Sequence, residues 1–218
     1  MKVFFLRLIN MTVGLIFYAF GIVLLIQANI GYAPWEVFHV GLAEVTGLGI
    51  GFVSIIAGAV IVVLVTLLGE KFGIGTISSM VLTGVFIDVI LLIDFIPKTN
   101  GLIAGILMLF AGLILLSLGS YFYIKSAFGV GPRDNLMVVL AKKTKAPVGV
   151  CRGAVEVIVT IAGWLLGGMV GIGTIISVFA IGPCIQATFR AFKFDVTALK
   201  HETVEETYKF LTKYERPH

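Results

Sequence analysis

The chain carries one pattern twice. When the sequence is shifted by 98 residues against itself without gaps, 23 of the 77 positions from Gly14 to Ile90 are identical. The closest match is Gly-Ile-Gly-Thr-Ile at 73–77, which returns at 171–175. Both copies are strongly apolar. Duplicated hydrophobic units build many membrane transporters, whose binding site lies at the interface between the copies, so the repeat predicts both a fold and the place of a site.

Composition predicts an all-α, polytopic membrane protein. Hydrophobic residues make up 59% of the chain and charged residues 13%, against about 25% charged residues in soluble domains. Several apolar runs approach the roughly 20 residues that cross a bilayer core of about 30 Å. The net charge of +4 gives no reason to expect nucleic acid. Cys151 and Cys184 fall in predicted spans without the spacing of a metal or redox site, so we interpret them as small apolar fillers.

Each copy is predicted to hold a long span, a Gly/Pro loop, a short helix and two further spans. The expected helices are 8–28, 34–46, 50–68 and 75–93 in the first copy, and 102–127, 132–144, 149–167 and 173–192 in the second. A helix from Trp35 to Thr46 would be roughly 18 Å long, too short to cross a core of about 30 Å. The short helices are therefore expected to be either interfacial or re-entrant.

Charge favours an inverted pair of repeats with three spans each. With a cytoplasmic N-terminus, the inside segments hold 15 of the 16 Lys and Arg residues, and only Lys98 lies outside. The matched loops then have opposite charge, as the positive-inside rule predicts for inverted copies. The alternative is a parallel arrangement of four spans per copy. We expect a multi-pass protein of the bacterial plasma membrane with both termini in the cytoplasm, and a first span that is retained because no small-residue cleavage site follows it.

Three parts of the chain follow from this division: a first membrane repeat at 1–98, a second at 99–192, and a tail at 193–218. The tail has capping-box form at 203–206. Val204, Tyr208 and Leu211 recur at helical spacing. The tail is predicted to form a cytoplasmic amphipathic helix on the membrane surface, with a docking site for a partner as the alternative.

The paired loops and the two Gly-x-Gly-Thr-Ile motifs carry a family resemblance. The loops read Gly-Tyr-Ala-Pro-Trp-Glu at 31–36 and Gly-Val-Gly-Pro-Arg-Asp at 129–134. In these motifs the sequence resembles the YczE-like bacterial integral membrane proteins, which are related to the YitT-like group. The resemblance covers the chain up to about residue 192. It implies a bacterial plasma-membrane protein and supplies neither a substrate nor catalytic residues.

The two loop–helix junctions are the first candidate site. Gly31 and Gly129 allow unusual backbone conformations, and Pro34 and Pro132 suit the first position of a helix. Each junction would present unpaired N–H groups and a partial positive charge. If both helices are re-entrant, their ends meet near mid-membrane and form a substrate site; otherwise they are interfacial helix starts. The side chains expected at this site are Trp35, Glu36, His39, Arg133, Asp134 and Asn135.

Charged residues inside spans are the second set of candidates. Glu156 lies in an apolar segment with Arg152 four residues earlier on the same helix face. Asp88 lies in another span, opposite Gln186 in the alignment of the copies. Such residues often mark transport pathways, which gives Asp88, Arg152 and Glu156 the expected role of gating or proton coupling. A structural ion pair and helix-to-helix hydrogen bonds are the alternatives.

Two functions compete on this evidence. The first is a secondary transporter or facilitator for a small polar solute. The second is a non-transporting scaffold or accessory protein for another membrane complex. The sequence holds no HExxH motif, no phosphate loop and no Cys/His cluster, so we expect no enzyme, no metal and no cofactor. The expected partners are the lipid bilayer and a small-molecule solute, with a homodimer left open.

Overall fold

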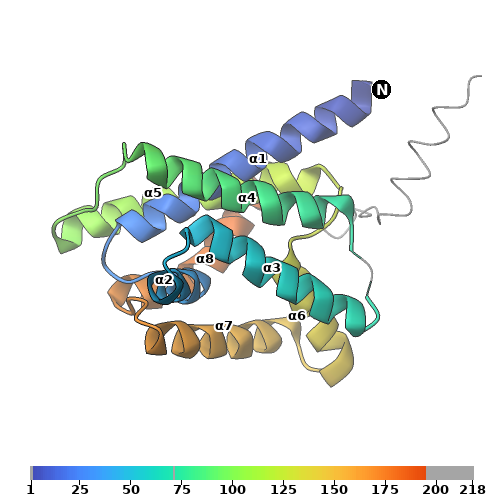
Figure 1. Ribbon diagram of the computed structural model, residues 1–218. Helices are drawn as coiled ribbons and strands as arrows, with labels where there is room; N and C mark the ends of the chain where they lie inside the picture. The colour runs from blue at the N-terminus through green and yellow to red at the C-terminus, as the bar shows by residue number, and fades with distance from the viewer. Residues whose placement is uncertain (1, 71, 195–218) are drawn as a thin grey trace, which may run out of the picture.

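The computed structural model describes residues 2–70 and 72–194, and these residues form a bundle of eight α-helices without strands (Figure 1). The helices are α1 (Lys2–Gln27), α2 (Pro34–Thr46), α3 (Ile50–Leu67), α4 (Ile74–Ile93), α5 (Leu102–Lys125), α6 (Pro132–Thr144), α7 (Val148–Leu165) and α8 (Ile172–Ala191). The expected all-α bundle is confirmed. The predicted amphipathic helix at 203–211 lies outside the described residues.

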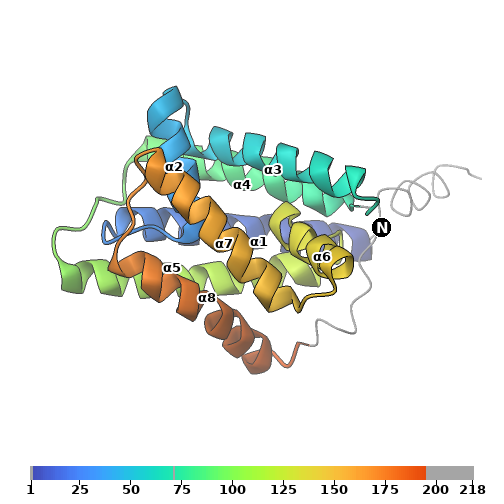
Figure 2. The same cartoon turned by 90° about the horizontal axis from the view of Figure 1, so that it is seen from below.

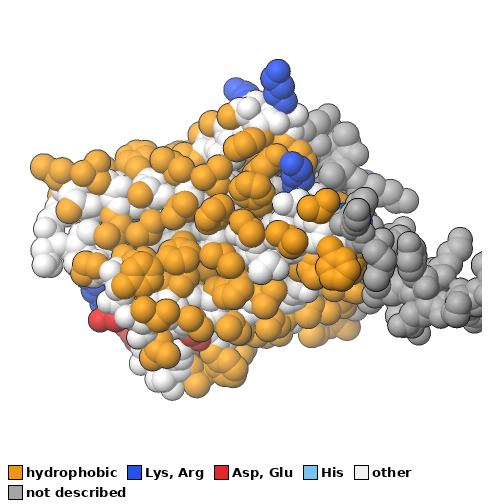
Figure 3. Space-filling model, turned by 90° about the horizontal axis from the view of Figure 1, so that it is seen from above, with side chains coloured by type: hydrophobic (Ala, Val, Ile, Leu, Met, Phe, Trp, Pro, Cys, Tyr) orange, Lys and Arg blue, Asp and Glu red, His pale blue; other side chains and the backbone are white. Residues whose placement is uncertain are grey.

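Six of the helices, α1, α3, α4, α5, α7 and α8, are long and apolar enough to cross a membrane. Many of their large hydrophobic side chains point outward, among them Leu92, Ile103 and Phe179, which are 86%, 78% and 74% exposed. Most side chains on the face seen in Figure 3 are hydrophobic and few are charged. Such a surface suits contact with lipid and not with water, so the protein is a multi-pass membrane protein.

The helices of the two copies match in length and position. The residue 98 positions after a given residue is called its twin below. The bounds of α6, α7 and α8 are those of α2, α3 and α4 shifted by 98, and α5 ends at the twin of the last residue of α1. Left-handed backbone conformations also recur in twin pairs: 29 with 127, 31 with 129, 47 with 145 and 69 with 167. The sequence repeat is thus also a repeat of local structure.

The most extensive helix–helix interface in the described bundle is between α1 and α5, which run in opposite directions (Figure 1). Glycines bring the two backbones together. A Cβ atom on Gly21 would lie 2.6 Å from the backbone nitrogen of Leu116 and 2.8 Å from the carbonyl of Gly112. A Cβ on Gly14 would lie 2.9 Å from the carbonyl of Gly119. The twins of Gly14 and Gly21 are Gly112 and Gly119, so each glycine faces the twin of the other.

The short helices join the two copies. α2 packs mainly on α7, and α6 packs on α3, while α1 contacts α4 and α5 contacts α8 within each copy. Figure 2 shows α2 and α6 near opposite ends of the long helices. α2 begins at the buried residues Pro34 and Trp35 and ends at the exposed residues Glu44 to Thr46. α6 begins at Pro132 and Arg133, which are half-buried and line a cavity inside the bundle, and its last residues are exposed. The start of each short helix therefore points into the bundle.

Candidate functional site

A cavity of about 350 Å³ lies between the two copies and is lined by the first turns of both short helices. This volume is at the small end of the range for ligand pockets, ~300–1,000 Å³. α2 contributes Pro34 to Glu36 and His39, and α6 contributes Pro132 to Asp134. Residues of α1, α3, α4, α5, α7 and α8 complete the wall. The structure thus brings the two predicted loop–helix junctions to one cavity.

The local sequence explains why these helix starts are open. Ala33 and Gly131 are extended N-cap residues without a side-chain cap, and a proline follows each of them. The first hydrogen bonds into the helices are those from Val37 to the Ala33 carbonyl and from Asn135 to the Gly131 carbonyl. The N–H groups of the first turn of α2 and of α6 have no partner within their helix. They give the N-terminal end of each short helix, which lies at the cavity, a partial positive charge.

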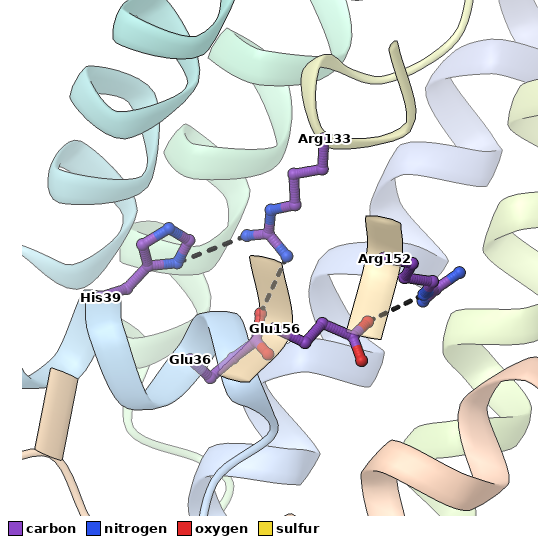
Figure 4. A network of polar contacts seen from close by, with 5 residues as sticks. All are labelled: Glu36, His39, Arg133, Arg152 and Glu156. Carbon is purple, nitrogen blue, oxygen red and sulfur yellow. Dashed lines mark hydrogen bonds and ion pairs between the residues drawn. The ribbon is translucent and has the colours of Figure 1, made fainter. Parts of the chain in front are cut away.

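Arg133 links α6 to α2 across the boundary between the copies (Figure 4). Its guanidinium lies 3.4 Å from Glu36 Oε1 and 3.4 Å from His39 Nδ1, and 4.7 Å from the centre of the Trp35 ring. Trp35 is buried, and its ring makes a cation–π contact with this guanidinium. The α2 side chains of Trp35, Glu36 and His39 therefore all contact one side chain of the other copy.

His39 is held in one protonation state by this contact. Arginine has no acceptor, so His39 Nδ1 must accept the hydrogen bond, and the neutral ring carries its proton on Nε2. Burial lowers the pKa of His39 well below its usual value, and the charge of Arg133 lowers it further. His39 is 2% exposed, and its Nε2 has no hydrogen-bond partner in the part of the chain that the structure describes. The Nε2–H group is thus a donor enclosed by protein and without an acceptor among the described residues.

A second ion pair forms another part of the wall. Arg152 Nε donates to Glu156 Oε1 over 2.8 Å, one turn apart on α7 (Figure 4). The glutamate side chain is 13% exposed and the arginine side chain 41%. Both line the cavity, so the pair predicted from the four-residue spacing is present and faces the space between the copies.

Asp134 is the cavity carboxylate that no ion pair neutralises among the described residues. It borders the cavity and is exposed there, although protein surrounds the cavity. Loss of hydration raises the pKa of its carboxyl, and the guanidinium groups of Arg152 and Arg133 oppose this effect. The charged groups of the wall are three carboxylates and two guanidiniums. With Glu36 and Glu156 paired, the excess negative charge belongs to Asp134.

Within residues 2–70 and 72–194, no three His, Cys, Asp or Glu side chains are grouped so that they could hold a metal ion. The polar side-chain groups that line the cavity are carboxylates, guanidiniums, hydroxyls and one imidazole. Such groups bind solutes through hydrogen bonds and charge.

Gly31 and Gly129 do not line the cavity; they allow the loops to pass against the other copy. Both have positive φ angles, 108° and 134°. A Cβ on Gly31 would lie 2.5 Å from the backbone nitrogen of Gly171, and one on Gly129 would lie 3.1 Å from the Cα of Gly73. Their part in the site is indirect, because they position the loops that lead into α2 and α6.

The two Gly-x-Gly-Thr motifs provide the surfaces on which these loops dock. Gly75 N–H donates to the carbonyl of Phe128 over 2.8 Å, and the Thr76 hydroxyl donates to the carbonyl of Val130 over 2.7 Å. In the other copy, Gly173 N–H donates to the carbonyl of Ile30 over 2.7 Å. Each motif therefore holds the loop of the opposite copy.

Asp88 and Asn135 also lie outside the cavity wall. The Asp88 carboxylate accepts hydrogen bonds from the N–H groups of Gly51 and Phe52, 2.7 and 2.9 Å long, and so caps the start of α3. Its twin Gln186 is exposed, so the two aligned polar residues have different surroundings. A helix start in an apolar bundle needs acceptors for its free N–H groups, and this need accounts for Asp88. Asn135 is buried behind the first turn of α6.

Sequence reasoning missed several polar residues of the spans that line the cavity. These are Tyr18, Ser79, Thr83, Ser120 and Tyr123. Their spacing carried a signal, since Ser79 and Thr83 are four residues apart and Ser120 and Tyr123 are three apart, so each pair shares a helix face. Hydroxyl groups are common inside membrane helices. Their spacing alone did not show which of these helix faces point toward the cavity, because the position of α6 was not known from the sequence.

Comparison with known proteins agrees with this architecture. Residues 5–190 match the model of a family described as a family of unknown function, DUF6198. The membrane protein YczE of Bacillus subtilis (strain 168), described as uncharacterized, is 37% identical over 176 residues, which are 79% of this chain and 80% of YczE. An uncharacterized protein of Haemophilus influenzae (strain ATCC 51907 / DSM 11121 / KW20 / Rd) is 28% identical over 180 residues, 80% of this chain and 82% of its own length.

A third relative, YyaS of Bacillus subtilis (strain 168), is 27% identical over 172 residues, covering 76% of this chain and 84% of YyaS. No solved structure matches the chain. The family model covers nearly all of the helical bundle, and the identity to YczE extends over most of both chains. The chain belongs to the YczE-like family of membrane proteins, DUF6198.

Proposed function

We propose that this protein is a secondary transporter or facilitator that moves a small polar solute across the bacterial plasma membrane. The observation that carries the proposal is the charged cavity between the two copies of a membrane bundle. Charges are costly inside a membrane protein and are found mainly on pathways and binding sites. Two helix starts, two ion pairs and an unpaired carboxylate meet in this cavity, in a place where inverted-repeat transporters bind their solutes.

The arrangement of the copies supports the same function. We infer that they are inverted, with α1 to α4 and α5 to α8 related by an axis in the membrane plane and both termini in the cytoplasm. The antiparallel contact of α1 with α5 and the exchange of loops between the copies support this inference. No nucleotide-binding motif is present in the sequence, so an ion gradient or the gradient of the solute would drive movement.

Asp134 indicates the kind of solute. An unpaired carboxylate on the wall of a cavity within a membrane protein is stabilised by a proton or by a cationic group. The partial positive charge of the two helix starts at the cavity would suit an acceptor on the same molecule. The proposed solute is therefore small, carries an ammonium or guanidinium group, and has a hydrogen-bond acceptor at its other end.

A binding screen on the purified protein tests this function. Thermal unfolding is recorded with panels of cationic, zwitterionic, anionic and neutral metabolites at mildly acidic and mildly basic pH. A cationic or zwitterionic hit should bind more tightly as pH rises through the raised pKa of Asp134, because the proton and the solute compete for one carboxylate. Asp134→Asn should weaken binding at least about tenfold, since a hydrogen bond to a charged group contributes about 1.5–3 kcal/mol, and should remove the pH dependence.

Asp94→Asn is the matched control. Asp94 is exposed outside the cavity in a left-handed conformation that asparagine tolerates well, so binding should be unchanged. Absence of any stabilising solute across the panels, or equal losses in both variants, would contradict the proposal. The scaffold hypothesis would then be preferred.

A further inference from the structure

The two copies differ in one contact between their own helices. α3 and α4 pack along each other, whereas their counterparts α7 and α8 make almost no contact. Figures 1 and 2 show α7 and α8 joined by a short turn and then apart, with α7 beside α2 and α6, and α8 beside α5. The cavity is bordered by both of these separated helices, through Arg152 and Glu156 on α7 and Ile181 and Ile185 on α8.

Glycines show how close α3 and α4 are. A Cβ on Gly51 would lie within 2 Å of the carbonyl oxygen of Gly84, and a Cβ on Gly84 would lie 2.5 Å from the carbonyl oxygen of Gly51. No other residue type fits at either position in this contact. The requirement for glycine at 51 and 84 is therefore steric.

The twins of these glycines are also glycines, but they have no neighbours. Nothing lies within 4 Å of an ideal Cβ on Gly149 or on Gly182. Gly182 lies inside α8, where glycine costs about 1 kcal/mol relative to alanine, and Gly149 lies in the first turn of α7. In the state shown here, no contact requires glycine at either position. A state in which α7 and α8 meet as α3 and α4 do would require it.

A second feature of α8 points the same way. Pro183 lies inside the helix directly after Gly182, whereas the twin of this proline is Val85 in the uninterrupted α4. Proline removes one backbone hydrogen bond and weakens the helix at that point. The half of α8 that follows Pro183 can therefore change direction relative to the half that precedes it.

We propose that α7 and α8 close on each other through Gly149 and Gly182, in the manner of Gly51 and Gly84, and that this movement shuts the cavity on the α7–α8 side. The inference rests on the proposed function for its purpose, which is to expose the cavity to one side of the membrane at a time. The geometry of the closed state is inferred only from the α3–α4 contact at Gly51 and Gly84. In the proposed orientation, the structure is the state in which the side nearer the cytoplasmic end of α7 is open.

Disulfide trapping tests the closure without any solute. In the α3–α4 contact, an ideal Cβ on Gly84 lies 2.5 Å from Cγ1 of Ile55, and the twin of Ile55 is Gly153. Cysteines introduced as Gly153→Cys and Gly182→Cys, with Cys151 and Cys184 replaced by serine, should thus be within bonding reach in the closed state. In the open state they are too far apart, because a disulfide requires Cβ atoms about 3.5–4.5 Å apart and both positions face empty space.

Oxidation in nanodiscs should convert most of the double-cysteine protein to an intramolecular disulfide, seen as a shift in gel mobility that reductant reverses. The pair Gly153→Cys with Phe179→Cys is the control, because Phe179 is 74% exposed and its twin Val81 is exposed as well. That pair should stay reduced. No disulfide at 153 and 182, or equal yields for both pairs, would overturn the proposal.

Two further substitutions in the Gly153→Cys, Gly182→Cys protein separate closure from random motion. Gly149→Ile fits the open state, where the site is empty, but cannot fit the closed contact, so trapping should be lost while the temperature of thermal unfolding is not lowered. Val150→Phe adds similar bulk at the next residue and copies its twin Phe52, which stays 49% exposed in the packed pair, so trapping should persist. Trapping without any binding solute would support the movement and refute the transport function, whereas a binding solute without trapping would refute the movement alone.

Discussion

The ion pair of Arg152 and Glu156 stands where the first copy has Ser54 and Gly58. All four positions line the cavity. One wall is therefore charged and the matching wall nearly neutral, which breaks the symmetry of the site. The packing of two equivalent copies does not require this difference. The Arg152–Glu156 pair is therefore the best candidate for a function specific to the second copy.

Removing one partner of this pair should cost more than removing both. Glu156→Gln leaves Arg152 unpaired, and the cost should fall between the ~0–1 kcal/mol of a surface pair and the ~3–5 kcal/mol of a buried one, because the arginine side chain is 41% exposed. We expect about 1–3 kcal/mol. Adding Arg152→Gln should recover part of this loss. Thermal unfolding of the wild type, both single variants and the double variant gives the coupling, and additive losses would show that each residue is solvated on its own.

Individual residues were predicted from the sequence to different extents. The i, i+4 spacing was enough for Arg152 and Glu156, and the alignment of the copies was enough to place Pro34 and Pro132 at equivalent positions. Asp88 could not be assigned, because an aspartate that caps a helix of its own copy and one that lines a pathway look alike in a span. The contact of Arg133 with Trp35, Glu36 and His39 depends on how α6 faces α2, and no local pattern encodes that.

Helices were the most predictable level of this fold. Hydrophobic length fixed the six spans, and proline at the first position fixed the start of α2 and α6 at residues 34 and 132. Partners of the helices were less accessible to sequence reasoning. α2 packs on α7 and not chiefly on its neighbour α3, because Gly163 and Gly168 let the backbone of α2 approach closely at Val37 and Phe38. Small residues permit such close approach. Because the chain holds 26 glycines, the sequence alone does not show which of them contact α2.

The α1–α5 contact gives a matched test of how glycine acts in this bundle. Gly21→Ala places a methyl group 2.6 Å from the backbone nitrogen of Leu116, and overpacking of this kind costs typically 1–3 kcal/mol. Gly149→Ala enters empty space and should stabilise the open state by up to about 1 kcal/mol. Thermal unfolding in detergent should therefore shift in opposite directions for the two variants. Equal shifts would mean that α1 and α5 are not packed as closely as described.

Each copy packs its short helix and its loop against the other copy. α2 of the first copy lies on α7 of the second, α6 of the second lies on α3 of the first, and each Gly-x-Gly-Thr motif binds the loop of the other copy. Such reciprocity arises when one rotation by half a turn exchanges the copies. Because α1 and α5 are antiparallel (Figure 1), an axis of this kind would be perpendicular to the spans. An axis of this direction would lie in the membrane plane, which is the arrangement that the proposed inversion of the copies requires.

Inversion predicts the sides on which the two short helices end. Glu44 near the end of α2 should face the outside, and Lys143, near the end of α6, should face the cytoplasm, where 15 of 16 basic residues are then found. Both residues are exposed, so Glu44→Cys and Lys143→Cys, in a protein lacking Cys151 and Cys184, are accessible to an impermeant thiol reagent. In intact cells only the cysteine at 44 should be labelled, and the cysteine at 143 should react after the cells are opened. Labelling of both from one side would exclude inversion and favour the parallel arrangement, in which each copy crosses the membrane four times.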